Sequence, residues 1–90
     1  MMVWEILMGY EKKDFTAFEF YKDNNLDEKK EVFSSFLAVS RILTGLFGEN
    51  MLMRRKDGER YVYTQIEELR NLSYWEAKHK ALRKLKRLLL

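Results

Sequence analysis

The pattern of apolar and polar positions changes along this 90-residue chain. Residues 3–10, VWEILMGY, and residues 15–22, FTAFEFYK, are rich in aromatic and β-branched side chains, and the polar stretch EKKD separates them. This composition is typical of strands, so the two segments predict a hairpin. Phe15, Phe18 and Tyr21 also recur at helical spacing, which leaves a helix over residues 15–22 as an alternative.

A wide apolar stripe predicts a long helix over residues 26–47. Asn25 and Glu28 have the spacing of a capping box, in which two side chains satisfy the first backbone N–H groups of a helix. Gly48 is a residue type at which helices often end. A stripe of this width is typical of a helix that packs on a sheet or on a partner. Its members are Val32, Phe36, Val39, Leu43 and Leu46, with Phe33, Leu37 and Phe47 beside them.

The stretch RRKDGERYVY, residues 54–63, predicts a second hairpin. Asp57-Gly58 between two strand-like runs favours a two-residue turn that needs positive φ at both positions. We expect the face that carries Met53 and Val62 to pack on the long helix. The resulting register pairs Lys56 with Glu59, Arg54 with Tyr61, Met53 with Val62, and Leu52 with Tyr63.

The last segment predicts a basic amphipathic helix from Tyr74 to Leu90. Ser73 and Glu76 form a second capping box at its start. One stripe is apolar and consists of Tyr74, Ala77, Ala81, Leu85 and Leu88. The opposite face holds His79 and six cations, namely Lys78, Lys80, Arg83, Lys84, Lys86 and Arg87.

These elements predict one α+β domain over residues 1–90, in the order ββαββα. Antiparallel hairpins would pack on the long helix, and the basic C-terminal helix would complete the core or join two subunits. A different order arises if residues 15–22 are helical and the long helix breaks near Ser34 and Ser35.

In that second order, RRKDGERYVYT resembles the wing of winged-helix transcriptional regulators, where a basic hairpin with a glycine turn leads into a strand bearing tyrosine and threonine. The resemblance implies a winged helix whose C-terminal helix is a dimerisation arm. The chain departs from the family pattern because no clear helix–turn–helix with a central glycine precedes the wing.

The residue inventory argues against an enzyme and against a cofactor. There is no cysteine, so neither a disulfide nor a thiolate metal site can form, and the single histidine, His79, cannot build a zinc site alone. The carboxylate pairs Asp27/Glu28 and Glu67/Glu68 are interpreted as helix-start and solvated charges, so no metal site is expected. The scattered glycines form no phosphate-binding loop.

The composition also resembles that of small proteins of hyperthermophilic archaeal viruses. The chain has no proline and one glutamine, and it is rich in lysine, glutamate and tyrosine, a texture that fits growth at high temperature. Neither a signal peptide nor a membrane-spanning run is predicted. We therefore expect the protein in the cytoplasm of a cell or host.

Charge is distributed unevenly along the chain. Residues 1–50 carry 6 basic and 9 acidic side chains, a net −3, whereas residues 51–90 carry 11 basic and 5 acidic ones, a net +6. A basic surface attracts nucleic-acid phosphates because binding releases condensed counterions. The candidate phosphate contacts are Arg54, Arg55, Lys56 and Arg60 in the hairpin and Lys80, Arg83, Lys84 and Arg87 in the last helix.

Two tyrosines of the hairpin, Tyr61 and Tyr63, are candidate stacking surfaces for unpaired bases. The functional hypothesis is therefore a small homodimeric nucleic-acid-binding protein, with DNA favoured over RNA. A basic amphipathic helix can also lie on an anionic membrane, but peripheral membrane contact is not the favoured role of the last helix. Two other interpretations stay open. The cations could merely solvate the surface, or the chain could be a protein-interaction or structural module that binds through its acidic half or its leucine stripe.

Overall fold

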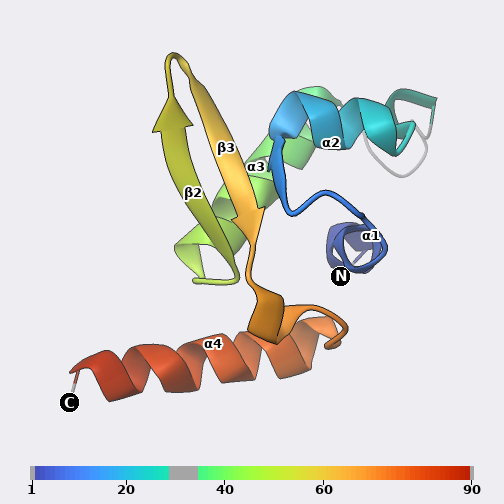
Figure 1. Cartoon of the computed structure of the whole chain (residues 1–90). Helices are drawn as coiled ribbons and strands as arrows, with labels where there is room; N and C mark the ends of the chain where they lie inside the picture. Colours follow the sequence, from blue (N-terminus) through green and yellow to red (C-terminus); the bar gives the residue numbers. More distant parts are fainter. Residues whose placement is uncertain (1, 29–34, 90) are drawn as a thin grey trace.

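The computed structural model describes residues 2–28 and 35–89 (Figure 1). In this part of the chain, four α-helices and a three-stranded antiparallel sheet form an α+β fold, so the predicted order ββαββα is wrong. The elements are α1 (Met2–Met8), β1 (Asp14–Thr16), α2 (Ala17–Asp23), α3 (Phe36–Gly48), β2 (Leu52–Asp57), β3 (Arg60–Gln65) and α4 (Tyr74–Leu89), with short 3-10 turns η1 (Leu26–Glu28) and η2 (Glu67–Leu69).

The segment predicted as the first strand is the helix α1. Its buried residues Val3, Trp4 and Leu7 lie on one helical face. Trp4 also donates its indole N–H to the carbonyl of Leu72 at 2.9 Å, which ties α1 to the connection before α4. The strand prediction failed because it weighed composition, whereas these contacts depend on helical spacing.

The second segment is helical over most of its length, so the predicted N-terminal hairpin is wrong and the helical alternative is confirmed for α2. Thr16 and Glu19 form a capping box: the Thr16 Oγ1 accepts the Glu19 N–H at 3.1 Å, and the Glu19 carboxylate accepts the Thr16 N–H at 3.0 Å. This cap ends β1 after Thr16 and starts α2 at the next residue.

The helix α3 corresponds to the C-terminal part of the predicted helix over residues 26–47. Ser35 caps it by accepting the Ala38 N–H at 3.1 Å, so the helix begins ten residues later than expected. Among the described hydrogen bonds, no side-chain capping box joins Asn25 and Glu28; Asn25 instead has φ 53°, and its carbonyl accepts the Glu28 N–H at 3.1 Å. Val32 and Phe33 of the predicted stripe lie outside the described residues.

The end of α3 sets the start of the hairpin. Asn50 has φ 62°, the left-handed conformation that follows many helices. The Asn50 N–H bonds to the Phe47 carbonyl at 3.0 Å and the Met51 N–H bonds to the Leu46 carbonyl at 2.9 Å. Both Met51 and Leu46 are fully buried, which completes a Schellman motif. The helix ends at Gly48, one residue after the predicted end at residue 47, and Asn50 rather than Gly48 has the left-handed conformation.

The second hairpin forms, but in a different register. Asp57 pairs with Arg60, so the turn residues are Gly58 and Glu59. Gly58 has φ 65° while Glu59 has no positive φ, a combination that belongs to a type II′ turn rather than type I′. The remaining pairs are Lys56 with Tyr61, Arg55 with Val62, Arg54 with Tyr63, Met53 with Thr64, and Leu52 with Gln65.

The hairpin packs on the core through the opposite face from the one predicted. Leu52 and Tyr63 are each 2% exposed, whereas Met53 is 51% exposed. The Tyr63 hydroxyl lies 3.1 Å from the Thr44 hydroxyl of α3, and its ring stacks on Phe15 of β1 at 6.2 Å between centroids. These contacts hold α3 and β1 against β3, the middle strand of the order β1-β3-β2.

Gln65 is a buried polar residue that fastens the N-terminal segment to the sheet. Its amide N–H groups donate to the carbonyls of Tyr10 and Lys12 at 3.1 and 2.9 Å. Its own N–H donates to the Lys13 carbonyl at 2.9 Å. These bonds give the buried Gln65 amide two acceptors and join three residues of the N-terminal segment to β3.

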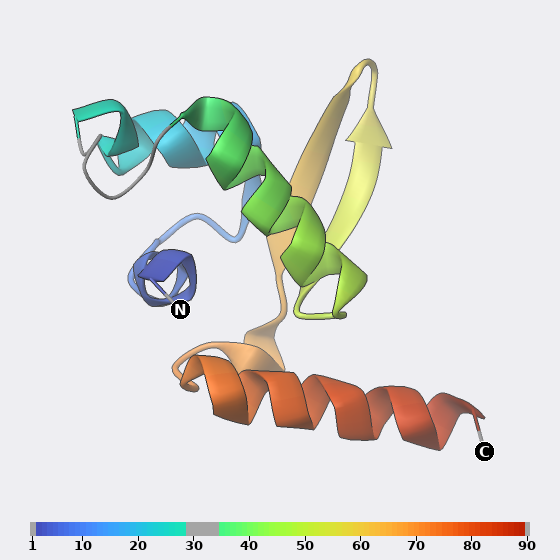
Figure 2. The same cartoon turned by 180° about the vertical axis from the view of Figure 1, so that it is seen from behind.

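The helix α4 begins as predicted but is poorly covered. The capping box of Ser73 and Glu76 forms, with both bonds at 3.3 Å. Ala77 and Ala81 are buried, while Leu88 is 77% exposed. In both views α4 extends along the end of the molecule away from the tip of the hairpin (Figures 1 and 2). In the described part of the chain, the structure contains no helix with the length and apolar character that a bilayer crossing requires.

A polar network around Tyr10 predicts acid sensitivity. Tyr10 donates to Asp23 at 2.6 Å, and Lys12 lies 2.9 Å from Asp23 and 3.2 Å from Glu19. The Tyr10 hydroxyl and then Lys12 hold the pKa of Asp23 below its usual range. The backbone N–H of Thr16 and then Lys12 hold the pKa of Glu19 low.

A carboxylate whose pKa is lower in the folded state stabilises the fold fully above its unfolded pKa of about 4, and this contribution is lost as the pH falls through the folded value. We therefore expect the thermal midpoint to fall progressively below pH about 4. Asp23→Asn removes one of these carboxylates, so the thermal midpoint should fall less steeply with decreasing pH in the variant than in the wild type. Circular dichroism melts across pH measure both slopes. Equal slopes for the two proteins would contradict the assignment.

Candidate nucleic-acid interface

The tip of the β2–β3 hairpin carries two exposed cations. Lys56 and Arg60 lie within two residues of the turn, and neither forms an ion pair within the described residues. They lie on opposite faces of the hairpin, because Lys56 is paired with Tyr61 and Arg60 is paired with Asp57. Arg55 lies 3.7 Å from the Asp14 carboxylate of β1. Its charge is therefore partly balanced within the chain.

Arg54 is held between two aromatic rings at the base of the hairpin. Its guanidinium lies 4.3 Å from the centroid of Phe47 and 4.0 Å from that of Tyr61. One face of the exposed Tyr61 ring is thus already occupied. Tyr63 is buried, so the stacking role predicted for it has no accessible ring in this structure.

The cations of α4 lie away from those of the hairpin tip. Lys84 is 3.6 Å from the Glu68 carboxylate, and the Lys80 ammonium donates to the Glu68 carbonyl at 3.4 Å. Arg83 and Arg87 are exposed and form no ion pair with any described residue. Both views place the hairpin tip and α4 at opposite ends of the molecule (Figures 1 and 2). The predicted phosphate contacts therefore do not form one surface: Lys56 and Arg60 lie at the hairpin tip, whereas Arg54 lines a groove together with the four α4 cations.

The outer face of α3 is a feature that sequence reasoning did not select. Arg41 is the one charged residue of α3, and it is exposed together with residues that are mostly small or uncharged. Besides Phe36 at its first position, the exposed residues of α3 are Leu37, Arg41, Thr44, Gly45 and Gly48. A sequence signal for this face existed, since these positions lie opposite the buried stripe of Val39, Leu43 and Leu46.

The face of α3 and the hairpin are neighbours. Figure 2 shows α3 crossing the hairpin, and two contacts fix this packing: Thr44 with Tyr63 at 3.1 Å, and Phe47 with Arg54 at 4.3 Å. Together the two elements carry five cations and two carboxylates, a net +3, because α3 adds Arg41 to the four cations, Asp57 and Glu59 of residues 52–65.

The N-terminal elements and α4 carry net charges of opposite sign. Residues 2–28 carry 3 basic and 7 acidic side chains, a net −4, and α4 carries 6 basic and 1 acidic one, a net +5. The described chain thus has an acidic N-terminal part followed by two basic regions. An anionic polymer would be attracted to α3 and the hairpin or to α4, and repelled by α1, β1 and α2.

The histidine and carboxylate side chains decide whether the surface could hold a metal ion. His79, on α4, is exposed. Within residues 2–28 and 35–89, no group of three histidine or carboxylate side chains is placed so that it could hold a metal ion. The predicted absence of an enzymatic activity and of a cofactor stays a prediction. Comparison with protein-family models, with curated proteins and with solved structures finds no significant match to this chain.

Proposed function

We propose that the chain is a winged-helix protein that binds nucleic acid through α3 and the β2–β3 hairpin. The order α1-β1-α2-α3-β2-β3-α4, with β3 between β1 and β2 in the sheet, supports this architecture. It is the alternative order that follows when residues 15–22 are helical and a new helix starts after Ser35. The departure from the family pattern remains, since residues 24–35 between α2 and α3 contain no glycine.

The single observation that carries the proposal is the exposed face of α3 beside the basic hairpin. This helix contains no carboxylate, and its outer face presents Thr44, whose side chain is small, and Gly45 and Gly48, which have no side chain, so another molecule can approach the helix closely. An α-helix fits the major groove of B-form DNA, whereas the major groove of A-form RNA is deep and narrow. Duplex DNA is therefore the favoured partner.

Each cation has a role in this arrangement. Arg41 extends from α3 towards the duplex, while Lys56 and Arg60 contact phosphates from the hairpin tip. Arg54, fixed between Phe47 and Tyr61, adds positive potential at the junction. Because phosphate contacts position a protein without reading bases, we expect weak sequence preference. Titration of a short labelled duplex at low salt tests the proposal; no binding would favour the protein-interaction alternative.

The second part of the proposal is a homodimer formed through α4. Trp75, Leu82 and Leu89 are 64%, 47% and 78% exposed. They are spaced by seven residues and therefore lie almost on one line along the helix. Such a line of large apolar side chains facing water is typical of a helix that pairs with another helix. We infer that the partner is α4 of a second copy.

Leu82→Gln should weaken the dimer by about a hundredfold or more, because the leucine is buried twice, once by each copy. Sedimentation velocity should then show a shift towards the 11.0 kDa monomer. Leu88→Gln is the matched control, since Leu88 is exposed on a different line of the same helix. A monomeric wild-type protein, or equal loss in both variants, would contradict this arrangement.

A further inference from the structure

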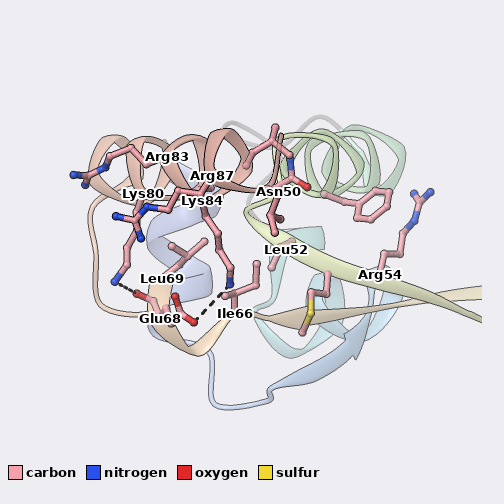
Figure 3. A pocket seen from close by; sticks show the side chains of 15 residues that line it. Asn50, Leu52, Arg54, Ile66, Glu68, Leu69, Lys80, Arg83, Lys84 and Arg87 are labelled. Carbon is pink, nitrogen blue, oxygen red and sulfur yellow. Dashed lines mark hydrogen bonds and ion pairs between the residues drawn. The ribbon is translucent and has the colours of Figure 1, made fainter. Parts of the chain in front are cut away.

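A groove of about 740 Å³ lies between α4, the base of the hairpin and the end of α3 (Figure 3). This volume falls within the range of about 300 to 1000 Å³ that is typical of small-molecule sites. The α4 side of the groove runs from Lys80 to Leu88, a length of about 12 Å at the rise of an α-helix. The groove is therefore long enough for an extended chain molecule.

The floor of the groove is apolar. Leu52, Ile66 and Leu69 line it from the body of the domain, and Leu85 and Leu88 line it from α4. Leu52 and Leu69 are also part of the hydrophobic core, so the floor is continuous with a packed interior. An apolar ligand placed there would remove Leu88, which is 77% exposed, from water.

The rim of the groove is cationic. Lys80, Arg83, Lys84 and Arg87 lie on the α4 side, and Arg54 lies at the other end (Figure 3). The carboxylate that lines the groove belongs to Glu68, and Lys84 already lies 3.6 Å from it. Arg83 and Arg87 have no described carboxylate partner. The rim therefore offers two arginines for an anion.

We propose that this groove binds the monomeric anion of a long-chain fatty acid. The alkyl chain lies on the leucine and isoleucine floor, and the carboxylate is held by Arg83 and Arg87 in charge-assisted hydrogen bonds. A second copy of α4 is not the proposed occupant, because the proposed dimer pairs α4 through the line of Trp75, Leu82 and Leu89, and none of these three residues lines the groove.

The site shares Arg54 with the proposed nucleic-acid surface, but the residues replaced to test the proposed function lie outside it. Trp75, Leu82 and Leu89 do not line the groove, and neither do Arg41, Lys56 or Arg60. Fatty-acid binding can therefore be measured without nucleic acid. The variant Arg41→Gln/Lys56→Gln/Arg60→Gln should bind fatty acid like the wild type, so failure of one proposal is distinguishable from failure of the other.

Isothermal titration of the full chain with dodecanoate tests the site. We expect saturable binding of one molecule per chain, with a dissociation constant on the order of micromolar. Hexanoate should bind at least about a hundredfold more weakly because it buries fewer methylene groups. Dodecyltrimethylammonium, which has the same tail and the opposite charge, should bind at least about tenfold more weakly.

Arg83→Gln/Arg87→Gln should weaken dodecanoate binding by about tenfold or more. Lys86→Gln is the matched control because Lys86 is a cation of the same helix outside the groove, and it should leave binding unchanged. Equal loss in both variants would overturn the site, as would equal binding of the two dodecyl compounds.

Two other results would assign the groove to a different occupant. Adsorption to anionic vesicles without binding of monomeric dodecanoate would assign the groove to a membrane surface. Loss of the dimer in Leu88→Gln would assign the groove to a second copy of the chain.

Discussion

Replacing Phe15 with alanine is expected to unfold a large fraction of the protein. Phe15 is 1% exposed and lies at the centre of an aromatic cluster, with ring centroids at 5.3 Å from Tyr10, 5.6 Å from Phe20 and 6.2 Å from Tyr63. It therefore joins β1 to α2 and to the hairpin. Truncating a buried phenylalanine costs roughly 3–5 kcal/mol, because transfer and cavity costs add.

This loss is large against the stability available to a domain of this size, which is on the order of 5–13 kcal/mol at about 0.05–0.15 kcal/mol per residue. The thermal midpoint should fall by at least roughly 15 °C. Phe18→Ala is the matched control, since Phe18 is the same residue type three positions later and is 59% exposed. Circular dichroism melts measure both. Similar losses in the two variants would mean that the aromatic cluster is not the centre of the core.

Replacing Arg41, Lys56 and Arg60 together with glutamine is expected to reduce DNA affinity by a factor of several hundred. Each phosphate contact contributes about 0.9 to the slope of log K against log salt concentration, so three contacts near 0.1 M salt account for about 2.7 decades. All three side chains are exposed, so their replacement should not unfold the protein. Fluorescence anisotropy with a short labelled duplex measures the affinity.

The control for this variant is Lys80→Gln/Arg83→Gln/Arg87→Gln, which removes the same number of charges from α4. Its affinity should stay within about fivefold of the wild type, since a change in net charge alone acts weakly through screening at this salt concentration. If the α4 variant instead shows the larger loss, the nucleic-acid surface lies on α4 and α3 has another role.

The sequence predicted the C-terminal helix α4 but not the N-terminal helix α1, and this difference has a physical reason. The start of α4 was predicted correctly because its signal is local: Ser73 and Glu76 satisfy each other's backbone N–H groups within one turn. By contrast, α1 has seven residues, fewer than an isolated helix needs to be stable. Its helicity depends on packing and on the bond from Trp4 to Leu72, which lie far apart in sequence.

A local signal for α2 was present in the sequence but was missed. Thr16-Ala17-Phe18-Glu19 has the spacing of a capping box, and the structure forms it. The strand prediction for residues 15–22 was based on their aromatic composition. Here the backbone preference set by the cap determined the outcome, and the apolar side chains were accommodated on a helical face.

The alternation of apolar and polar residues along the hairpin does not determine its register. A shift of two residues keeps every side chain on its own face, so the pattern of apolar residues fits both registers equally. The choice depends on the turn, where Gly58 supplies the one positive φ of a type II′ turn. The buried face of the hairpin is set by the contacts of Thr44 and Phe15 with Tyr63. No local sequence pattern predicts these contacts.

Half of the candidate site was predictable. The hairpin cations stand together in the sequence, so their clustering was visible. The role of Arg41 was not predicted, because a single cation in an apolar helix becomes informative only when that helix is seen to lie beside the hairpin. The same helix has no carboxylate on its outer face. The separation of α4 from the hairpin tip is likewise a property of the three-dimensional arrangement.

The salt dependence of DNA binding tests the central claim most directly. The logarithm of the association constant should fall linearly with the logarithm of salt concentration for the wild type, and the slope should be shallower by about 2.7 for the Arg41, Lys56 and Arg60 variant. The α4 variant should retain the wild-type slope. Identical slopes for the wild type and the α3–hairpin variant would show that these three cations do not contact phosphate, and the proposed interface would be wrong.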